Sequence, residues 1–147
     1  MSLYLGIDAG GTHTRARLVD ESGRQLGRGE AGPANTRIGL DRCLHEINLA
    51  WRAAATAAGL DAAAIADIRA GLGIAGLNRR GVLPGLRAYP FPFQTLAIAS
   101  DASIACIGAH DGKDGGIVVV GTGSIGFGRI GEEIGRASCR ERVSLSV

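Results

Sequence analysis

Three short runs near the start of the chain, one apolar and the next alternating in polarity, have patterns typical of β-strands. Residues 3–7 form a short apolar run, residues 14–19 alternate, and residues 25–30 follow more weakly across a turn at residues 20–23. Because short connections join antiparallel strands, these runs predict an antiparallel meander.

Apolar residues then recur every three or four positions, which is the spacing of an amphipathic helix, and Gly59 ends the run. Residues 68–74 and 94–99 are apolar runs that predict a fourth and a fifth strand. Since helical crossovers join parallel strands, these two strands should run parallel to the first. The helix stripe consists of Leu40, Cys43, Leu44, Ile47, Ala50, Trp51, Ala54 and Ala58.

The connection between the fourth and fifth strands should hold at most a short helix, because prolines interrupt residues 84–90. Residues 102–110 predict a helix with Asp101 near its N-cap, and residues 116–120 and 125–129 predict a hairpin. The pattern predicts an α/β fold: a mixed five-stranded sheet of order 3-2-1-4-5 with crossover helices, followed by a hairpin.

Polar and glycine residues follow four of the predicted strands at their carboxyl ends. They are Asp8, the Ala34-Asn35 loop, the pair Ala75-Gly76, and Asp101. The strands that they follow should all point the same way, so these residues should meet at one edge of the sheet. Open α/β sheets bind ligands at that edge, beside the point where the strand order reverses.

Composition is that of an ordinary globular protein, with 46% hydrophobic and 20% charged residues. The formal net charge of +2 is too small to indicate a nucleic-acid or membrane partner. The opening residues lack the basic region of a signal peptide, and no apolar stretch reaches the roughly 20 residues of a membrane span, so we expect a cytoplasmic protein. The cysteines Cys43, Cys106 and Cys139 lack metal-ligand spacing, and we interpret the first two as small core residues.

The end of the chain differs in character from the rest. Residues 133–147 show neither a helical nor a strand period, and residues 133–143 resemble the translation of a common sequencing-library adapter. We therefore expect residues 1–112 to form one domain, residues 113–132 to open a second, and the remainder to be a non-native tail. On this interpretation the natural protein continues beyond Glu132; a natural basic tail is the alternative.

The stretch GIDAGGTHTR combines features suited to binding a phosphate group. Gly10 and Gly11 let the backbone approach a ligand, while Thr12 and Thr14 offer hydroxyl donors to anionic oxygens. Asp8 would be repelled by bare phosphate, so its presence indicates a Mg²⁺ ion held through water. The alternative is a tight hairpin turn, which explains the glycines but not the other three residues.

A second turn, Gly121-Thr122-Gly123-Ser124, has the same chemistry between two predicted strands. Taken alone it is equally consistent with an ordinary hairpin turn.

Five segments carry a family resemblance: GIDAGGTHTRARLVD, GPANTRIG, GLGIAGLNR, SDASIACIGAHDG and GGIVVVGTGSIGFGR. They resemble the sugar kinase, heat-shock chaperone and actin superfamily. Within it they most resemble the BadF/BadG/BcrA/BcrD ATPase family, on its N-acetylglucosamine and glucosamine kinase branch. The resemblance runs over residues 3–132 and implies a ribonuclease H-like (actin-like ATPase) domain that uses ATP and Mg²⁺ to phosphorylate an amino-sugar hydroxyl.

The resemblance also implies roles for individual residues. Those that would grip the ATP phosphates are Gly10, Gly11, Thr12, Gly121, Thr122 and Gly123. Asp101 would be the catalytic base, while Asn35, Gly76 and Ser124 would lie at the sugar. The family's adenosine pocket lies in a second domain that is missing here, so we expect the 147-residue chain alone to be inactive. The sequence leaves open whether the protein forms a homodimer.

Simpler interpretations compete with each of these roles. Asp101 could serve only as a helix N-cap, Asn35 could be a turn residue, and Gly76 could be a packing glycine.

Other functions compete with a kinase. A dehydratase-activating ATPase of the same family would need iron–sulfur cysteines, yet Cys43 and Cys106 fall on predicted helices. A sugar-sensing repressor would need a DNA-binding segment ahead of the first strand. A non-catalytic, actin-like nucleotide-binding protein would need no base.

Overall fold

The computed structural model describes residues 2–120, 124–131 and 133–139, and it divides into two units between Asp101 and Ala102. The division precedes the domain boundary expected at residue 112, which stays a prediction.

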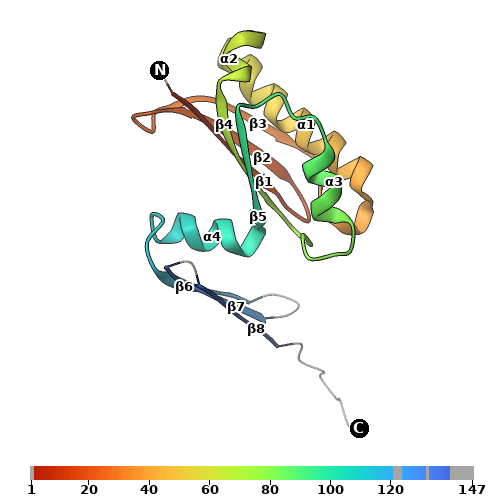
Figure 1. Cartoon of the computed structure of the whole chain (residues 1–147), viewed down its shortest axis with the longest axis vertical. Coiled ribbons are helices and arrows are strands. Elements are labelled where there is room, and N and C mark those ends of the chain that lie inside the picture. The colour runs from red at the N-terminus through yellow and green to blue at the C-terminus, as the bar shows by residue number, and fades with distance from the viewer. Residues whose placement is uncertain (1, 121–123, 132, 140–147) are drawn as a thin grey trace. The chain divides into compact units, whose positions relative to one another are not determined.

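The first unit is built on a five-stranded sheet of order β3-β2-β1-β4-β5, which confirms the predicted order (Figure 1). The first three strands form the antiparallel meander, while β4 pairs with β1, and β5 with β4, in parallel. The strands are β1 (Leu3–Ala9), β2 (Thr14–Asp20), β3 (Gln25–Ala31), β4 (Ile68–Ile74) and β5 (Thr95–Ser100). The helical segments are η1 (Thr36–Ile38), α1 (Leu40–Ala57), α2 (Ala62–Ala66) and α3 (Val82–Ala88).

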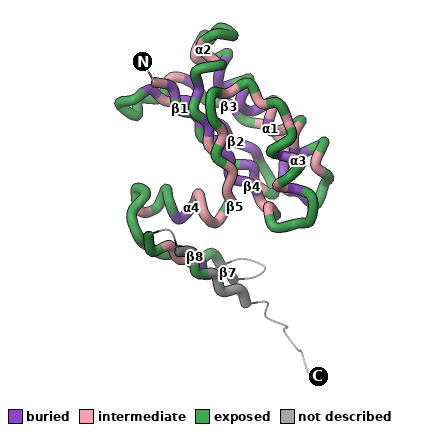
Figure 2. Tube along the Cα trace, viewed as in Figure 1, coloured by how far each residue is buried: buried purple, intermediate pink, exposed green. Residues whose placement is uncertain are grey.

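One face of the sheet packs against α1 and forms the core (Figure 2). Along β1 every second residue is buried, whereas Tyr4, Gly6 and Asp8 are exposed on the other face. Cys43 and Trp51 on α1 are buried, as predicted from their place in the helix stripe. No helix in the described part of the chain is long and apolar enough to cross a membrane.

Two glycines let α1 approach β3 closely. A Cβ at Gly29 would overlap the carbonyl oxygen of Ala50 and lie 2.7 Å from the amide nitrogen of Ala54. A Cβ at Gly27 would overlap the carbonyl oxygen of Ala54 in the same way. Any side chain at either position would therefore push the helix backbone away from the sheet.

The second unit contains the rest of α4 (Asp101–Ala109) and a three-stranded antiparallel sheet of β6 (Gly115–Val120), β7 (Ser124–Ile130) and β8 (Glu133–Cys139). The Cys106 thiol is buried and donates to the carbonyl oxygen of Gly115, at 3.3 Å.

The strand β8 was not predicted from the sequence, which shows no strand period after Glu132. Its backbone pairs with β7 from Glu133 opposite Ile130 to Cys139 opposite Ser124. The strand was missed because polarity in EIGRASC alternates consistently over its last four residues only. The foreign origin of this segment stays a prediction.

The Asp20 carboxylate organises the turn between β2 and β3. It accepts hydrogen bonds from the Ser22 hydroxyl at 2.6 Å and the Ser22 amide at 2.9 Å, and its other oxygen accepts from Arg24 Nε at 3.1 Å. These donors, the Ser22 hydroxyl foremost, lower the pKa of Asp20 from 3.8 to about 2.

We predict that Gly29→Ala destabilises the protein by about 3 kcal/mol or more, because the helix must shift to admit one methyl group. The matched control is Gly71→Ala on β4, where a Cβ meets nothing within 4 Å, and it should change stability by less than about 1 kcal/mol. Urea unfolding followed by circular dichroism measures both. Equal losses in the two variants would contradict the close approach.

The lowered pKa of Asp20 predicts a loss of stability in acid. A carboxyl group whose folded pKa lies below its unfolded value stabilises the fold above about pH 4 and loses that effect as the pH falls toward 2. Asp20→Asn should therefore lower the urea midpoint at about pH 6 and much less at about pH 2. The control is Asp67→Asn at the end of α2; a similar pH dependence there would contradict a special role for Asp20.

Candidate functional site

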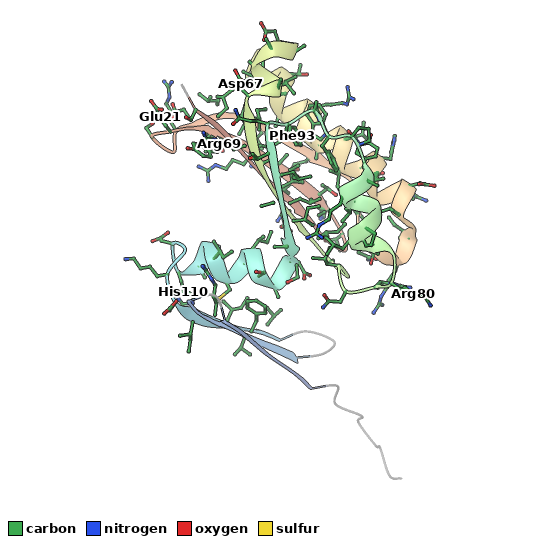
Figure 3. The ribbon with its side chains drawn as sticks, viewed as in Figure 1. Glu21, Asp67, Arg69, Arg80, Phe93 and His110 are labelled. Atoms are coloured by element: carbon green, nitrogen blue, oxygen red, sulfur yellow. The ribbon has the colours of Figure 1, made fainter. Side chains whose placement is uncertain are left out.

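Three loops meet at the carboxyl ends of β1, β3 and β4, held by backbone hydrogen bonds. The Ala34 amide donates to the carbonyl oxygen of Gly10, and the Ala75 amide to that of Ala9, both at 3.0 Å. The Thr36 amide donates to the carbonyl oxygen of Ala75 at 3.2 Å. In Figure 3, Arg80 marks the loop after β4, at the end of the sheet opposite Glu21 in the β2–β3 turn. The predicted convergence of these loops is therefore present.

The Gly10-Gly11 turn has room beside Gly11, whereas a Cβ at Gly10 would lie 3.0 Å from the carbonyl oxygen of His13. The Gly10 amide donates to the carbonyl oxygen of His13 at 3.0 Å, which closes the turn. Gly11 is exposed, and a Cβ there would lie 3.6 Å from Asn35 Nδ2. Thr12 is also exposed, with its hydroxyl 3.1 Å from His13 Nδ1. A ligand can thus reach the glycines and the Thr12 hydroxyl from solvent.

The hydroxyl of Thr14 has a different partner from the one predicted from the sequence, which was a phosphate oxygen. The residue is fully buried, and its hydroxyl donates to the carbonyl oxygen of Gly32 at 2.8 Å. It lies on the same face of β2 as Ala16 and Leu18, which both point into the core. Thr14 therefore supports the neighbouring loop and does not face the ligand side of the turn.

The Asn35 side chain is held in one orientation. Its Oδ1 caps η1 by accepting from the Arg37 amide at 2.8 Å, which leaves Nδ2 as the donor on the side of Gly11. Its carbonyl oxygen accepts from the Cys43 thiol at 3.0 Å. Burial raises the pKa of that thiol and so keeps it a neutral donor.

Gly76 follows β4 with a φ of +82°, a conformation that side chains other than glycine rarely adopt. A Cβ there would overlap the Thr36 hydroxyl oxygen, which donates to the Gly76 carbonyl at 3.0 Å. Both the backbone angle and the close neighbour require glycine.

Two carboxylates lie at the ends of strands at the same edge. Asp8 is exposed on the face of the sheet that α1 leaves open, paired across the strands with Arg15 and Gly73. Ser100, the last residue of β5, pairs with Ile74, so Asp101 begins α4 directly beyond the carboxyl end of the sheet. Within the described part of the chain, no three His, Cys, Asp or Glu side chains are grouped to hold a metal ion.

Most of the second predicted phosphate turn falls outside the part of the chain that the structure describes. Gly121, Thr122 and Gly123 lie outside the described residues, and Ser124 begins β7 in the second unit. Their roles stay predictions.

Three supporting residues escaped the sequence analysis: Thr36, Cys43 as a donor, and Glu46. The Glu46 carboxylate accepts from the Gly32 amide at 2.7 Å. The signal in the sequence was the position of Glu46 directly before Ile47, a residue of the buried stripe of α1. For Thr36 the signal was its place directly after Asn35 in a loop.

The model of the BadF/BadG/BcrA/BcrD ATPase family matches residues 5–141. The glucosamine kinase GspK of Vibrio cholerae is 35% identical over 127 residues, which are 86% of this chain and 43% of that protein.

Solved structures agree with this match. A structure assigned to an N-acetylglucosamine kinase of Chromobacterium violaceum matches with a TM-score of 0.82 and 32% identity, over 93% of this chain and 48% of that one. A glucokinase of the ROK family from Streptomyces griseus, in complex with glucose and AMPPNP, matches with a TM-score of 0.55 and 22% identity, over 92% and 47% of the two chains; it shows the shared fold alone. The chain thus spans about half the length of these relatives.

The packing at Gly76 predicts a measurable penalty for a side chain there. Gly76→Ala should destabilise the protein by about 1–3 kcal/mol more than Gly81→Ala. Gly81 is the matched control because its φ is +81° and a Cβ there meets nothing within 4 Å, so the difference isolates the overlap with Thr36. Thermal unfolding of both variants measures it, and equal losses would mean that only the backbone angle matters.

Proposed function

Because the chain belongs to the BadF/BadG/BcrA/BcrD ATPase family, we propose that it is the nucleotide- and sugar-binding part of a kinase that phosphorylates an amino-sugar hydroxyl with ATP. N-acetylglucosamine and glucosamine are the proposed substrates, since the relatives at 32% and 35% identity carry those names.

The convergence of three loops at one edge of the sheet carries this proposal. It brings the glycine turn next to an amide donor, Asn35, at the same edge of the sheet at which β5 leads to Asp101. A phosphoryl transfer site needs the same three features: room for phosphate oxygens, a hydrogen-bonding group for the acceptor, and a carboxylate base.

Asp101 is the proposed base. A sugar hydroxyl is a weak nucleophile at neutral pH, and a carboxylate within hydrogen-bond reach accepts its proton as the bond to phosphorus forms. Its position at the first turn of α4 also suits a capping role, so a test must separate the two.

The residues present fit MgATP. Gly11 leaves space where a side chain would otherwise stand, Gly10 permits the tight turn beside it, and the exposed Thr12 hydroxyl can donate to a phosphate oxygen. Asp8, a single exposed carboxylate, suits a Mg²⁺ ion that keeps most of its water ligands. MgATP would supply the phosphoryl group that the sugar hydroxyl receives.

The direct test uses the protein extended to the length of its relatives, because the proposed reaction requires closure of two domains around the substrate. ATP consumption is measured against a panel of hexoses and hexosamines, with glucose and galactose as controls. Turnover with glucosamine or N-acetylglucosamine supports the proposal. Turnover with neutral hexoses alone, or ATP hydrolysis indifferent to sugar, contradicts it.

In that extended protein, Asp101→Asn should lower kcat by at least about 10²-fold while melting temperature and ATP binding stay near those of the parent. Asparagine caps helices about as well as aspartate, so a capping role alone predicts little change. Coupled-assay kcat and calorimetric Tm are measured together. Asp114→Asn, in the loop after α4, serves as the control carboxylate, and an active Asp101→Asn variant would remove this residue from the mechanism.

A further inference from the structure

We propose that Thr36 is a positioning residue that couples the loop carrying Asn35 to the Ala75-Gly76 loop and so fixes Asn35 Nδ2 as a donor to the substrate. This inference rests on the proposed function, because it assigns the residue that holds the sugar-contacting amide in place.

Thr36 joins the two loops through both its backbone and its side chain. Its amide donates to the carbonyl oxygen of Ala75 at 3.2 Å, and its hydroxyl donates to that of Gly76 at 3.0 Å. The side chain is buried, so water cannot readily replace the hydroxyl as a donor.

The loop that carries Asn35 is held from its other sides as well. The Gly32 peptide is bound at its amide by Glu46 and at its carbonyl by Thr14. These contacts hold the beginning of the loop, whereas Thr36 alone links its far end to the loop that follows β4 among the hydrogen bonds described here. The Asn35 end keeps the Thr36 amide on the Ala75 carbonyl and the Cys43 thiol on the Asn35 carbonyl, so loss of the Thr36 hydroxyl should loosen this end without releasing it and leave the Gly32 end in place.

Asn35 depends on this link because it is the adjacent residue and the N-cap of η1. Its Oδ1 is occupied by the Arg37 amide at 2.8 Å, so Nδ2 is the atom that can recognise an acceptor such as a sugar hydroxyl oxygen. A shift of Thr36 would turn this amide away from the side of Gly11, where a Cβ would lie 3.6 Å from Nδ2.

The variants are Thr36→Val, which keeps the shape and removes the donor, and Thr36→Ser, which keeps the donor. The first measurement is amide hydrogen exchange in the 147-residue chain, where the Arg37 amide reports whether Asn35 still caps η1. Exchange at Arg37 should rise about tenfold in Thr36→Val and stay near the parent's in Thr36→Ser, while the amide of Leu5 in the core is unchanged.

The second measurement is steady-state kinetics in the protein extended to its relatives' length. Thr36→Val should raise the KM for the amino sugar about tenfold, with the KM for ATP changed less than about twofold, and Thr36→Ser should restore the parent values. If Thr36 only stabilised the fold, Thr36→Val would lower Tm without raising the KM for the amino sugar more than the KM for ATP. An unchanged sugar KM overturns the proposal even where exchange at Arg37 rises.

The outcomes separate the two proposals. If the extended parent protein phosphorylates no amino sugar, the proposed function fails, and exchange at Arg37 still decides whether Thr36 holds the Asn35 loop. If Thr36→Val does not fold, Gly76→Ala displaces the same hydroxyl from the other side, with Gly81→Ala as the control for backbone angle. Unchanged exchange at Arg37 in Gly76→Ala then overturns the coupling.

Discussion

The candidate site depends on backbone hydrogen bonds between loops that are distant in the sequence. Peptide groups in irregular loops need partners, and here the carbonyls of Ala9 and Gly10 accept from residues of the other two loops. The parallel pairing of β1 with β4 brings Ala9 level with Ile74, which puts the following residues within reach. The sheet order therefore determines which loops can share hydrogen bonds, and those bonds determine where Asn35 and Gly76 lie.

Packing of α1 contributes to the same arrangement. Gly27 and Gly29 admit the helix close to β3, and the helix then presents Cys43 and Glu46 to the loop that follows this strand. Side chains on β3 would hold the helix farther out. The Cys43 thiol would then move away from the Asn35 carbonyl, and the Glu46 carboxylate from the Gly32 amide. Strand glycines far from any ligand thereby affect the geometry of the site.

Sequence patterns were sufficient to predict the five-stranded sheet, because the alternation along β2 and the helix stripe of α1 report burial directly. The role of Thr14 was also within reach, since Ala16 and Leu18 on the same face are core residues. The role of Thr36 was not, because it depends on the carbonyl of Gly76, forty residues away. Periodicity describes one element at a time, so contacts between loops escape it.

The polar residues of the site divide by burial into two groups with different tasks. Thr14 and Thr36 are buried and satisfy backbone groups, whereas Gly11, Thr12 and Asp101 are exposed at the same edge. A buried hydroxyl that donates to a carbonyl orders the loop, since an unpaired carbonyl in the core is costly. An exposed residue can be reached by a ligand from solvent. The buried hydroxyls thus fix the positions of the loops, and the exposed residues at this edge lie on a fixed backbone, which is the preorganisation that the proposed substrate site requires.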